Sequence, residues 1–261
     1  MSRWTQEPAR MNIEPIHQFN IEPLFKIGQI GDQPIYFTNS SAYMLLTVAL
    51  ISLLMIGGAA GKQLVPGRFQ SMAEITYEFV ASTIRSNAGA EGMKFFPLIF
   101  SIFMFICVSN LVGVIPYAFT LSSHIIITAT LALLVFFTVM IYGFYKNGLK
   151  FFKIFVPSGI PIYILPLVVF IEVFSFFLRP VSHSVRLFAN MLAGHIALKV
   201  FAGFVALLGV SLGAVGWIGG IAPLALTVAI YALEILVAFL QAYVFAILTV
   251  IYLNDAIHPG H

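Results

Sequence analysis

A few polar residues interrupt two long apolar stretches late in the sequence, and Arg186 is the most informative of them. A guanidinium group keeps its proton in proteins, so Arg186 carries a fixed positive charge wherever it lies. Placing that charge at bilayer depth costs roughly 3 kcal/mol on insertion scales and more in simulations. A permanent cation that cannot carry protons, surrounded by groups that can, indicates an ion pathway with a fixed electrostatic barrier.

The neighbouring polar residues have types that exchange protons or form hydrogen bonds. Those on the same stretch as Arg186 are Glu172, Arg179, His183, Asn190, His195 and Lys199, and those on the last stretch are Glu234 and Gln241. A histidine titrates near physiological pH, and a carboxylate beside it can exchange protons with it. His195 and Glu234 are therefore candidates for proton transfer, although a satisfied polar pair between two helices would use the same residue types.

Helical spacing sorts these residues onto faces. At 100° per residue, Glu172, Arg179 and Arg186 are seven residues apart and fall within about 40° of one another. Asn190 lies one turn beyond Arg186 on the same side, whereas His195 lies on the opposite side of a straight helix. The spacing predicts that Arg186 separates an inner polar cluster near Glu172 from an outer one near His195.

Structural roles remain open for the same residues. Arg186 could be the ion-pair partner of Glu172 or Glu234, and Glu172 could instead pair with Arg179. Hydrogen bonds between helices would explain Asn190 and Gln241, and packing or snorkelling would explain His183 and Lys199.

The composition identifies the class of protein. The chain has 261 residues, of which 60% are hydrophobic and 9% charged, whereas soluble domains carry about 25% charged residues. We expect an all-α, polytopic membrane protein with one membrane domain, 1–261. The net charge of +3 is too small and dispersed to suggest nucleic-acid binding, and the lone Cys107 excludes an intrachain disulfide. The sequence also lacks a phosphate-binding GxxxxGK[ST] loop and metal-ligand spacing such as HExxH, so no cofactor or metal is expected.

Apolar runs predict three conventional membrane spans, at 42–61, 95–117 and 125–145. Segment 69–92 alternates apolar and polar faces at helical spacing, which predicts an amphipathic helix at the membrane interface, with a soluble loop helix as the alternative. Positive charge gathers in 62–94 and 146–153, and the loops at 118–124 and 207–222 have none. By the positive-inside rule, the polar segment 1–40 lies outside and the C-terminus inside.

Two further apolar stretches, 161–206 and 223–253, are too long for upright spans. As helices they would measure ~65 Å and ~45 Å, against a bilayer core of ~30 Å. They must tilt strongly, kink or break, and Pro180 is a candidate kink. The glycine-rich segment 209–220 predicts a turn between them, or helix packing through small residues. Together they form a helical hairpin.

Two motifs give the chain a family resemblance. "RLFANMLAGH" at 186–195 and "LEILVAFLQAYVFAILTVIYL" at 233–253, preceded by "NLVGVIPY" at 110–117, resemble the subunit a family of F-type ATP synthases. The resemblance implies the stator half of a proton channel, with two offset half-channels that meet a rotating ring of c subunits. It further implies b-type peripheral stalk subunits, an indirect link to the F1 sector, and a bacterial inner membrane, with the mitochondrial inner membrane as alternative.

The resemblance also implies roles for individual residues. Arg186 would face the ring carboxylate and block proton leakage between the half-channels, with Asn190 and Gln241 near it. His195 and Glu234 would lie in the outer half-channel and Glu172 in the inner one. Asn110 matches a polar family position, and His183 receives no role. Some family members exchange the acid and histidine of the outer pair.

Two other functions fit parts of the pattern. Arg186 could bind an anionic substrate in a secondary transporter, but no internal repeat is present. A membrane-embedded metallohydrolase would use histidines, but their spacing matches no known ligand set.

Overall fold

Six α-helices make up most of the computed structural model, which describes residues 20–30, 33–60, 66–115, 118–156 and 160–258. The elements in chain order are β1 (Pro23–Ile30), β2 (Gln33–Thr38), α1 (Asn39–Ala60), α2 (Arg68–Gly92), η2 (Met93–Phe95), α3 (Phe96–Val114), η3 (Leu121–Ser123), α4 (Ile125–Asn147), η4 (Gly148–Phe155), α5 (Leu165–Gly219) and α6 (Ile221–Ile257). Five of the helical stretches are long and apolar enough to cross a membrane, with α2 and α3 counted as one.

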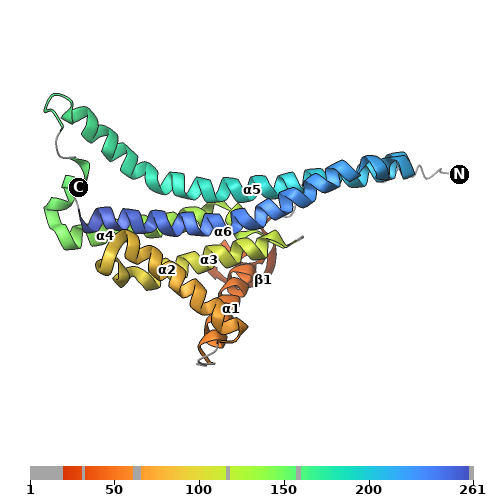
Figure 1. The fold of residues 1–261 in the computed structure, drawn as a ribbon, viewed down its shortest axis with the longest axis horizontal. Helices are drawn as coiled ribbons and strands as arrows, with labels where there is room; N and C mark the ends of the chain where they lie inside the picture. Colours follow the sequence, from red (N-terminus) through yellow and green to blue (C-terminus); the bar gives the residue numbers. More distant parts are fainter. Residues whose placement is uncertain (1–19, 31–32, 61–65, 116–117, 157–159, 259–261) are drawn as a thin grey trace.

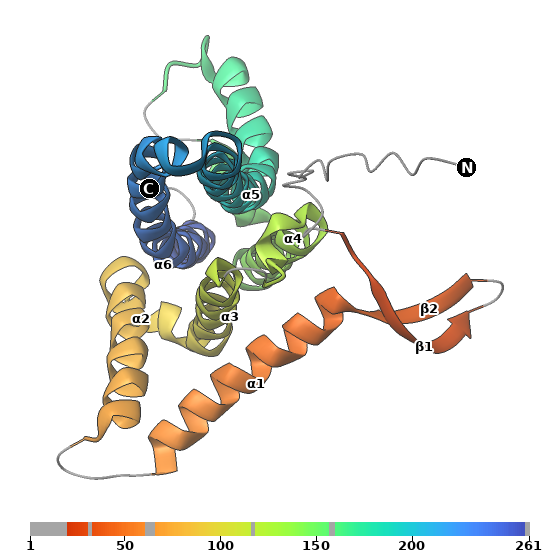
Figure 2. The same cartoon turned by 90° about the vertical axis from the view of Figure 1, so that its right-hand side faces the viewer.

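The two longest helices, α5 and α6, form a hairpin that runs along the whole length of the molecule (Figure 1). Helix α3 packs against α6, and α4 packs against α5. Helix α1 contacts α2 and α3 and leans away from the hairpin, as Figure 2 shows with the long helices seen almost end-on. The hairpin therefore has one side covered by α3 and α4.

Small side chains let α6 lie close to its neighbours. Ala238, Ala242 and Ala246 recur every four residues and are buried, and Val250 continues the same row. Residues four apart share one side of a helix, and small residues there allow backbones to approach closely. This row puts α6 between α3 and α5, so the polar residues of α6 face the interior.

The chain is mostly helical, as expected for an all-α membrane protein, but it also has two strands near the N-terminus. Strands 23–30 and 33–38 form an antiparallel hairpin, in which Phe25 and Phe37 stack with ring centroids 4.8 Å apart. Charged residues recur along 1–40 and the two strands are short, so the sequence predicts only a polar segment there. Of that segment, 1–19 and 31–32 lie outside the described residues.

Helices occur close to where the sequence predicted them, and the largest difference is at the end of the first long helix. Helix α5 continues to Gly219, well beyond the predicted end at 206, and its backbone leaves helical torsions at Gly213, where φ is +57°. A positive φ is readily adopted only by glycine, so Gly213 is the point at which the hairpin can begin to turn. No such break occurs at Pro180, although Figure 1 shows α5 curving away from α6 towards its N-terminal end.

The predicted span 95–117 is α3 only as far as Val114, and 116–117 lie outside the described residues. Segment 69–92 is helical as predicted, with a local break at Gly89, where φ is +62°. Its position at a membrane interface stays a prediction.

Candidate functional site

His195 and Glu234 come together between α5 and α6. The Nε2 atom of His195 lies 3.5 Å from Oε1 of Glu234, and the two residues are 6% and 4% exposed. Neither carboxylate oxygen of Glu234 forms a hydrogen bond with a described residue. A buried carboxyl group without a hydrogen bond is costly, and the imidazole beside it is a group with which it can exchange a proton.

Gly194 makes this approach possible. A Cβ atom at this position would lie 2.9 Å from Oε1 and 3.3 Å from Cδ of Glu234. Contacts below 3.0 Å are essentially never seen for real Cβ atoms, so any side chain at 194 would displace the carboxyl group. The missing side chain in "AGH" thus creates the space that Glu234 occupies.

Thr120, which the sequence alone did not indicate, is a third member of this cluster. Its Oγ1 atom lies 3.0 Å from Nε2 of His195, and the residue is fully buried. Thr120 begins the sequence Thr-Leu-Ser-Ser, in which three of the four residues carry hydroxyl groups, after a membrane-length helix. This group of hydroxyl side chains next to a membrane span is the signal that could have drawn attention to Thr120.

Asn110 connects this loop to two helices. Its amide donates a hydrogen bond to the carbonyl of Ala238 in α6 at 3.3 Å, and its side-chain oxygen accepts one from Ser122. Asn110 itself is buried in α3. It therefore links α3, α6 and the η3 loop.

Arg186 and Asn190 lie on the opposite, exposed side of α5. They belong to a stripe of exposed residues at helical spacing, formed by Ser182, Val185, Arg186, Ala189, Asn190 and Ala193 and called the α5 stripe below. Neither Arg186 nor Asn190 forms a hydrogen bond or ion pair with any described residue, so Arg186 does not pair with Glu172 or Glu234 here.

The other side of α5 is packed. Ser184, Leu187 and Met191 are buried, and the hydroxyl of Ser184 lies 3.0 Å from that of Thr128 in α4. The guanidinium group of Arg186 therefore lies on the exposed face of α5, whereas the opposite face of that helix packs against the rest of the chain.

Arg179 has a partner that spacing did not predict. Its Nη1 lies 3.0 Å from Oδ2 of Asp255, near the end of α6, and its guanidinium carbon lies 4.7 Å from the ring centroid of Tyr252. The suggested pair between Glu172 and Arg179 is therefore not formed. Glu172 is half-buried and makes no hydrogen bond or ion pair with the described residues.

Three remaining polar residues lie inside or at the edge of the hairpin. His183 is buried and stacks on Phe245 with ring centroids 3.8 Å apart, while its Nε2 finds no hydrogen-bond partner among the described residues. Gln241 is buried in α6, and Lys199 is half-buried one turn beyond His195. The stacking of His183 is a packing contact between α5 and α6.

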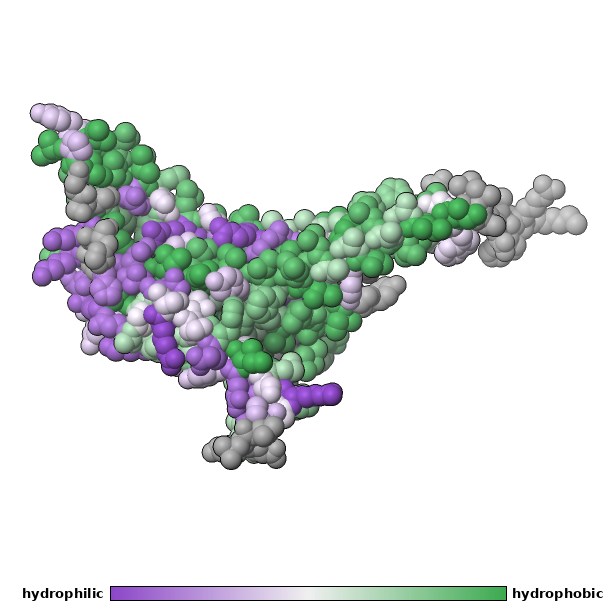
Figure 3. All heavy atoms as spheres, in the orientation of Figure 1, coloured by the Kyte–Doolittle hydropathy of each residue, from purple (hydrophilic) through white to green (hydrophobic). Residues whose placement is uncertain are grey.

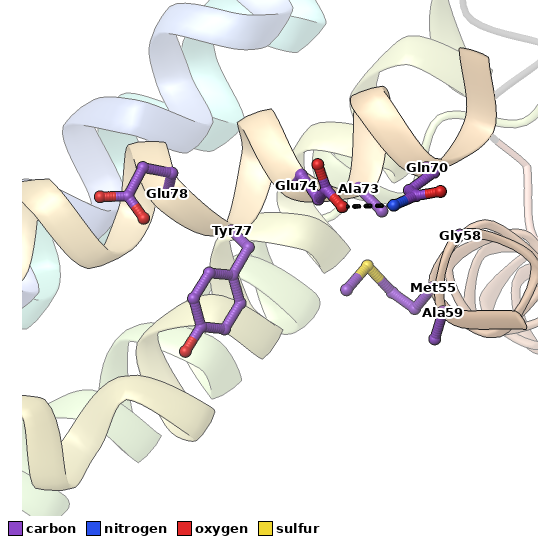
Figure 4. A pocket seen from close by; sticks show the side chains of 8 residues that line it. All are labelled: Met55, Gly58, Ala59, Gln70, Ala73, Glu74, Tyr77 and Glu78. Atoms are coloured by element: carbon purple, nitrogen blue, oxygen red, sulfur yellow. Dashed lines mark hydrogen bonds between the residues drawn. The ribbon is translucent and has the colours of Figure 1, made fainter. Parts of the chain in front are cut away.

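A separate hollow of about 530 Å³ lies between α1 and α2 (Figure 4). Gln70 and Glu74 line it and are hydrogen-bonded to each other at 2.8 Å, and Glu78 lies further along the same helix. None of the polar residues of α5 or α6 reaches this hollow.

The surface of the molecule has two regions of different polarity. Figure 3 shows hydrophilic side chains gathered at the end where the C-terminus lies, whereas the far part of the α5–α6 hairpin is hydrophobic. Lys146 of α4 forms an ion pair with Glu91 of α2 at the hydrophilic end. This distribution is typical of a membrane protein seen from within the bilayer plane.

Comparison with known proteins gives a consistent picture. The family model described as "ATP synthase A chain" matches residues 41–254. A protein of Bradyrhizobium diazoefficiens named "ATP synthase subunit a" is 81% identical over 251 residues, which cover 96% of this chain and the whole relative. Proteins with the same name from Rhodopseudomonas palustris strain BisB18 and Nitrobacter winogradskyi are each 74% identical over 249 residues, 95% of this chain and all of each relative.

Proposed function

The chain belongs to the ATP synthase A chain family, and on that premise we propose that it guides protons through two offset half-channels to and from a rotating ring of c subunits. As a multi-pass membrane protein and the a subunit of the Fo sector, it takes part in proton transport and ATP synthesis. Its sequence contains no phosphate-binding loop, so its contribution is proton transfer and torque against the ring of c subunits rather than nucleotide chemistry.

The observation that carries the proposal is the position of Arg186 on the open α5 stripe. A charged group on an exposed face of a membrane helix needs a partner that lies outside this chain. A carboxylate on each ring subunit supplies such a partner, because the fixed cation favours its ionised form. Asn190, one turn further along, offers the same carboxylate a hydrogen bond.

The buried pair of His195 and Glu234 forms the outer end of the path. His195 is nine residues beyond Arg186, which corresponds to about 14 Å along the helix. Protons arriving at the pair reach the ring on one side of Arg186. Gln241, seven residues after Glu234 on α6, lines the way between the pair and the arginine.

Glu172 forms the inner end. Glu172 and His195 are 23 residues apart in α5, about 35 Å of helix, and Arg186 lies between them along it. This separation is compatible with two ends that open towards opposite sides of one membrane. A proton moving directly from one end to the other would have to pass a like charge, and at 4 Å with an effective dielectric of 20 this repulsion is about 4 kcal/mol.

The distribution of positive charge supports one orientation in the membrane. By the positive-inside rule, the lysines near the hydrophilic end favour an arrangement with that end and the C-terminus inside and the N-terminal hairpin outside. We place the protein in a bacterial inner membrane, with b-type stalk subunits holding it and the F1 sector coupled through them.

Cysteine cross-linking in the assembled complex tests the contact with the ring. In a Cys107→Ser background, Ala189→Cys on the α5 stripe should form a disulfide with a cysteine placed beside the ring carboxylate. Leu45→Cys on α1, which is also exposed in this chain, is the control and should form none. A product from Leu45→Cys without one from Ala189→Cys would overturn the proposed docking face.

A further inference from the structure

Two groups compete for one ring nitrogen of His195. The hydroxyl oxygen of Thr120 lies 3.0 Å from Nε2, and the carboxylate oxygen of Glu234 lies 3.5 Å from the same atom. The nearer neighbour is the hydroxyl, and it comes from the loop after α3 rather than from the hairpin. His195 is therefore held from a part of the chain that does not belong to the α5–α6 hairpin.

A hydroxyl group can both donate and accept a hydrogen bond, whereas an imidazole nitrogen does one or the other according to its protonation. When Nε2 carries a proton, it can donate to Thr120 or to Glu234. When Nε2 is unprotonated, the Thr120 hydroxyl can turn and donate to it. The carbonyl oxygen of Gly113, 3.5 Å away, is the other acceptor that the hydroxyl can reach.

We propose that Thr120 is a positioning residue of the outer proton path, and that its hydroxyl keeps the His195 ring in place in both protonation states. The inference rests on the proposed function, since it assumes that Glu234 and His195 exchange a proton. When a proton moves from the Glu234 carboxyl group to Nε2, a carboxylate and an imidazolium result. The hydroxyl then changes from donor to acceptor without any movement of the backbone.

The loop that carries Thr120 packs against α5, but the hydrogen bonds described next, which hold it, are made to groups outside that helix. The Ser123 hydroxyl donates to the carbonyl of Thr120 at 2.6 Å, and Ser122 donates to Asn110, which is itself bonded to the carbonyl of Ala238. The loop residues Thr120, Ser122 and Ser123 are all buried. Such a loop can act as a fixed reference for a side chain whose charge changes.

The packing of α3 leaves space for the hydroxyl. A Cβ atom at Gly113 would lie 2.9 Å from Cγ2 and 3.1 Å from Oγ1 of Thr120, so only glycine leaves the threonine where it is. Two charged groups face His195: Glu234 from α6 and Lys199 from α5. Asn110, Thr120 and Ser122 are uncharged, and of these three Thr120 is the one whose hydroxyl lies within hydrogen-bond distance of His195.

Substitution of Thr120 in the assembled complex tests the inference. Thr120→Val keeps the shape and removes the hydroxyl, and we expect ATP-driven proton pumping in membrane vesicles to fall about 2- to 10-fold, the range that one neutral hydrogen bond supports. The pH at which pumping is half-maximal should shift as well. Thr120→Ser restores the hydroxyl and should remain within about twofold of the wild type.

Thr128→Val is the matched control. It also removes the hydroxyl of a fully buried threonine that contacts α5, but this hydroxyl is hydrogen-bonded to Ser184 rather than to His195. It should leave the pH profile unchanged. If Thr120→Val prevents assembly, Gly113→Ala carries the test, because it displaces the hydroxyl without removing it and should shift the profile in the same direction.

Wild-type pumping and an unshifted pH profile in Thr120→Val would overturn the inference, and so would an equal loss in Thr120→Ser. Glu234→Gln in the same assay separates this failure from that of the proposed function. If Glu234→Gln pumps normally, the outer path itself is wrong. If Glu234→Gln is impaired while Thr120→Val is not, only the role of Thr120 is rejected.

Discussion

Replacing Gly194 by alanine moves the Glu234 carboxyl group without removing any polar group from the chain. The new Cβ atom would lie 2.9 Å from Oε1 of Glu234, and ordinary van der Waals contact begins at 3.4 Å. The carboxyl group must therefore retreat by about 0.5 Å, the difference between these two distances. All three nearest atoms belong to the Glu234 side chain, so the backbone of α6 need not move.

The expected effect on proton transfer follows from this displacement. A misplacement of about 1 Å can cost about 100-fold in a reaction that depends on alignment, so half that distance corresponds to roughly 10-fold. Crowding of a packed interior costs about 1–3 kcal/mol of stability, which a complex of this size can tolerate. We expect Gly194→Ala to assemble in normal amounts and to pump protons about 10-fold more slowly.

The assay is ATP-driven acidification of membrane vesicles, normalised to the amount of assembled complex. Gly57→Ala on α1 is the control, because a Cβ atom there would meet nothing within 4 Å. Normal pumping by Gly194→Ala would refute the argument that the distance between Glu234 and His195 limits the outer path. Equal losses in both variants would show that the effect is not specific to the pair.

Three further predictions concern side chains around the hairpin. Arg179→Gln should lower the free energy of unfolding of the complex by about 1–2 kcal/mol, and adding Asp255→Asn should cost little more, as a double-mutant cycle in chemical denaturation will show. Burial lowers the pKa of His124 below its ordinary value of 6.5. The contribution of neutral His124 to the stability of the folded state is therefore complete above pH 6.5 and is lost as the pH falls below 6.5. His124→Phe, which preserves stacking on Phe119, should therefore lose less thermal stability than the wild type between pH 7.5 and pH 5.5. His183→Phe should pump within about twofold of the wild type if its stacking contact is its whole role, and a larger loss in the pumping assay would assign it to the path.

Residue type and helical spacing were sufficient for part of the site. The opposite faces expected for Arg186 and His195 are seen in α5, where the first is exposed and the second buried. His195 and Glu234 lie close together because both are buried where α5 and α6 pack against each other. These features depend on one helix or on one pair of adjacent helices, so periodicity describes them.

Contacts made by distant segments could not be predicted in this way. The partner of Arg179 is Asp255, which lies 76 residues away, and the neighbour of His195 is Thr120, which lies 75 residues away. No periodic pattern relates such positions, because the packing of several helices decides which loop meets which side chain. The short N-terminal hairpin was missed for another reason, since strands of eight and six residues leave only a weak alternation.

The passive proton permeability of vesicles that carry Arg186→Ala in the assembled complex tests the central claim most directly. A barrier between two half-channels predicts a gain of passive leak together with loss of ATP-driven pumping. Arg186→Lys should also fail to pump normally, because an ammonium group can lose its proton when buried and lacks the planar fork of arginine. Retained pumping with no leak in Arg186→Ala would contradict the account, since Arg186 would then be dispensable at the point where the two paths must be kept apart.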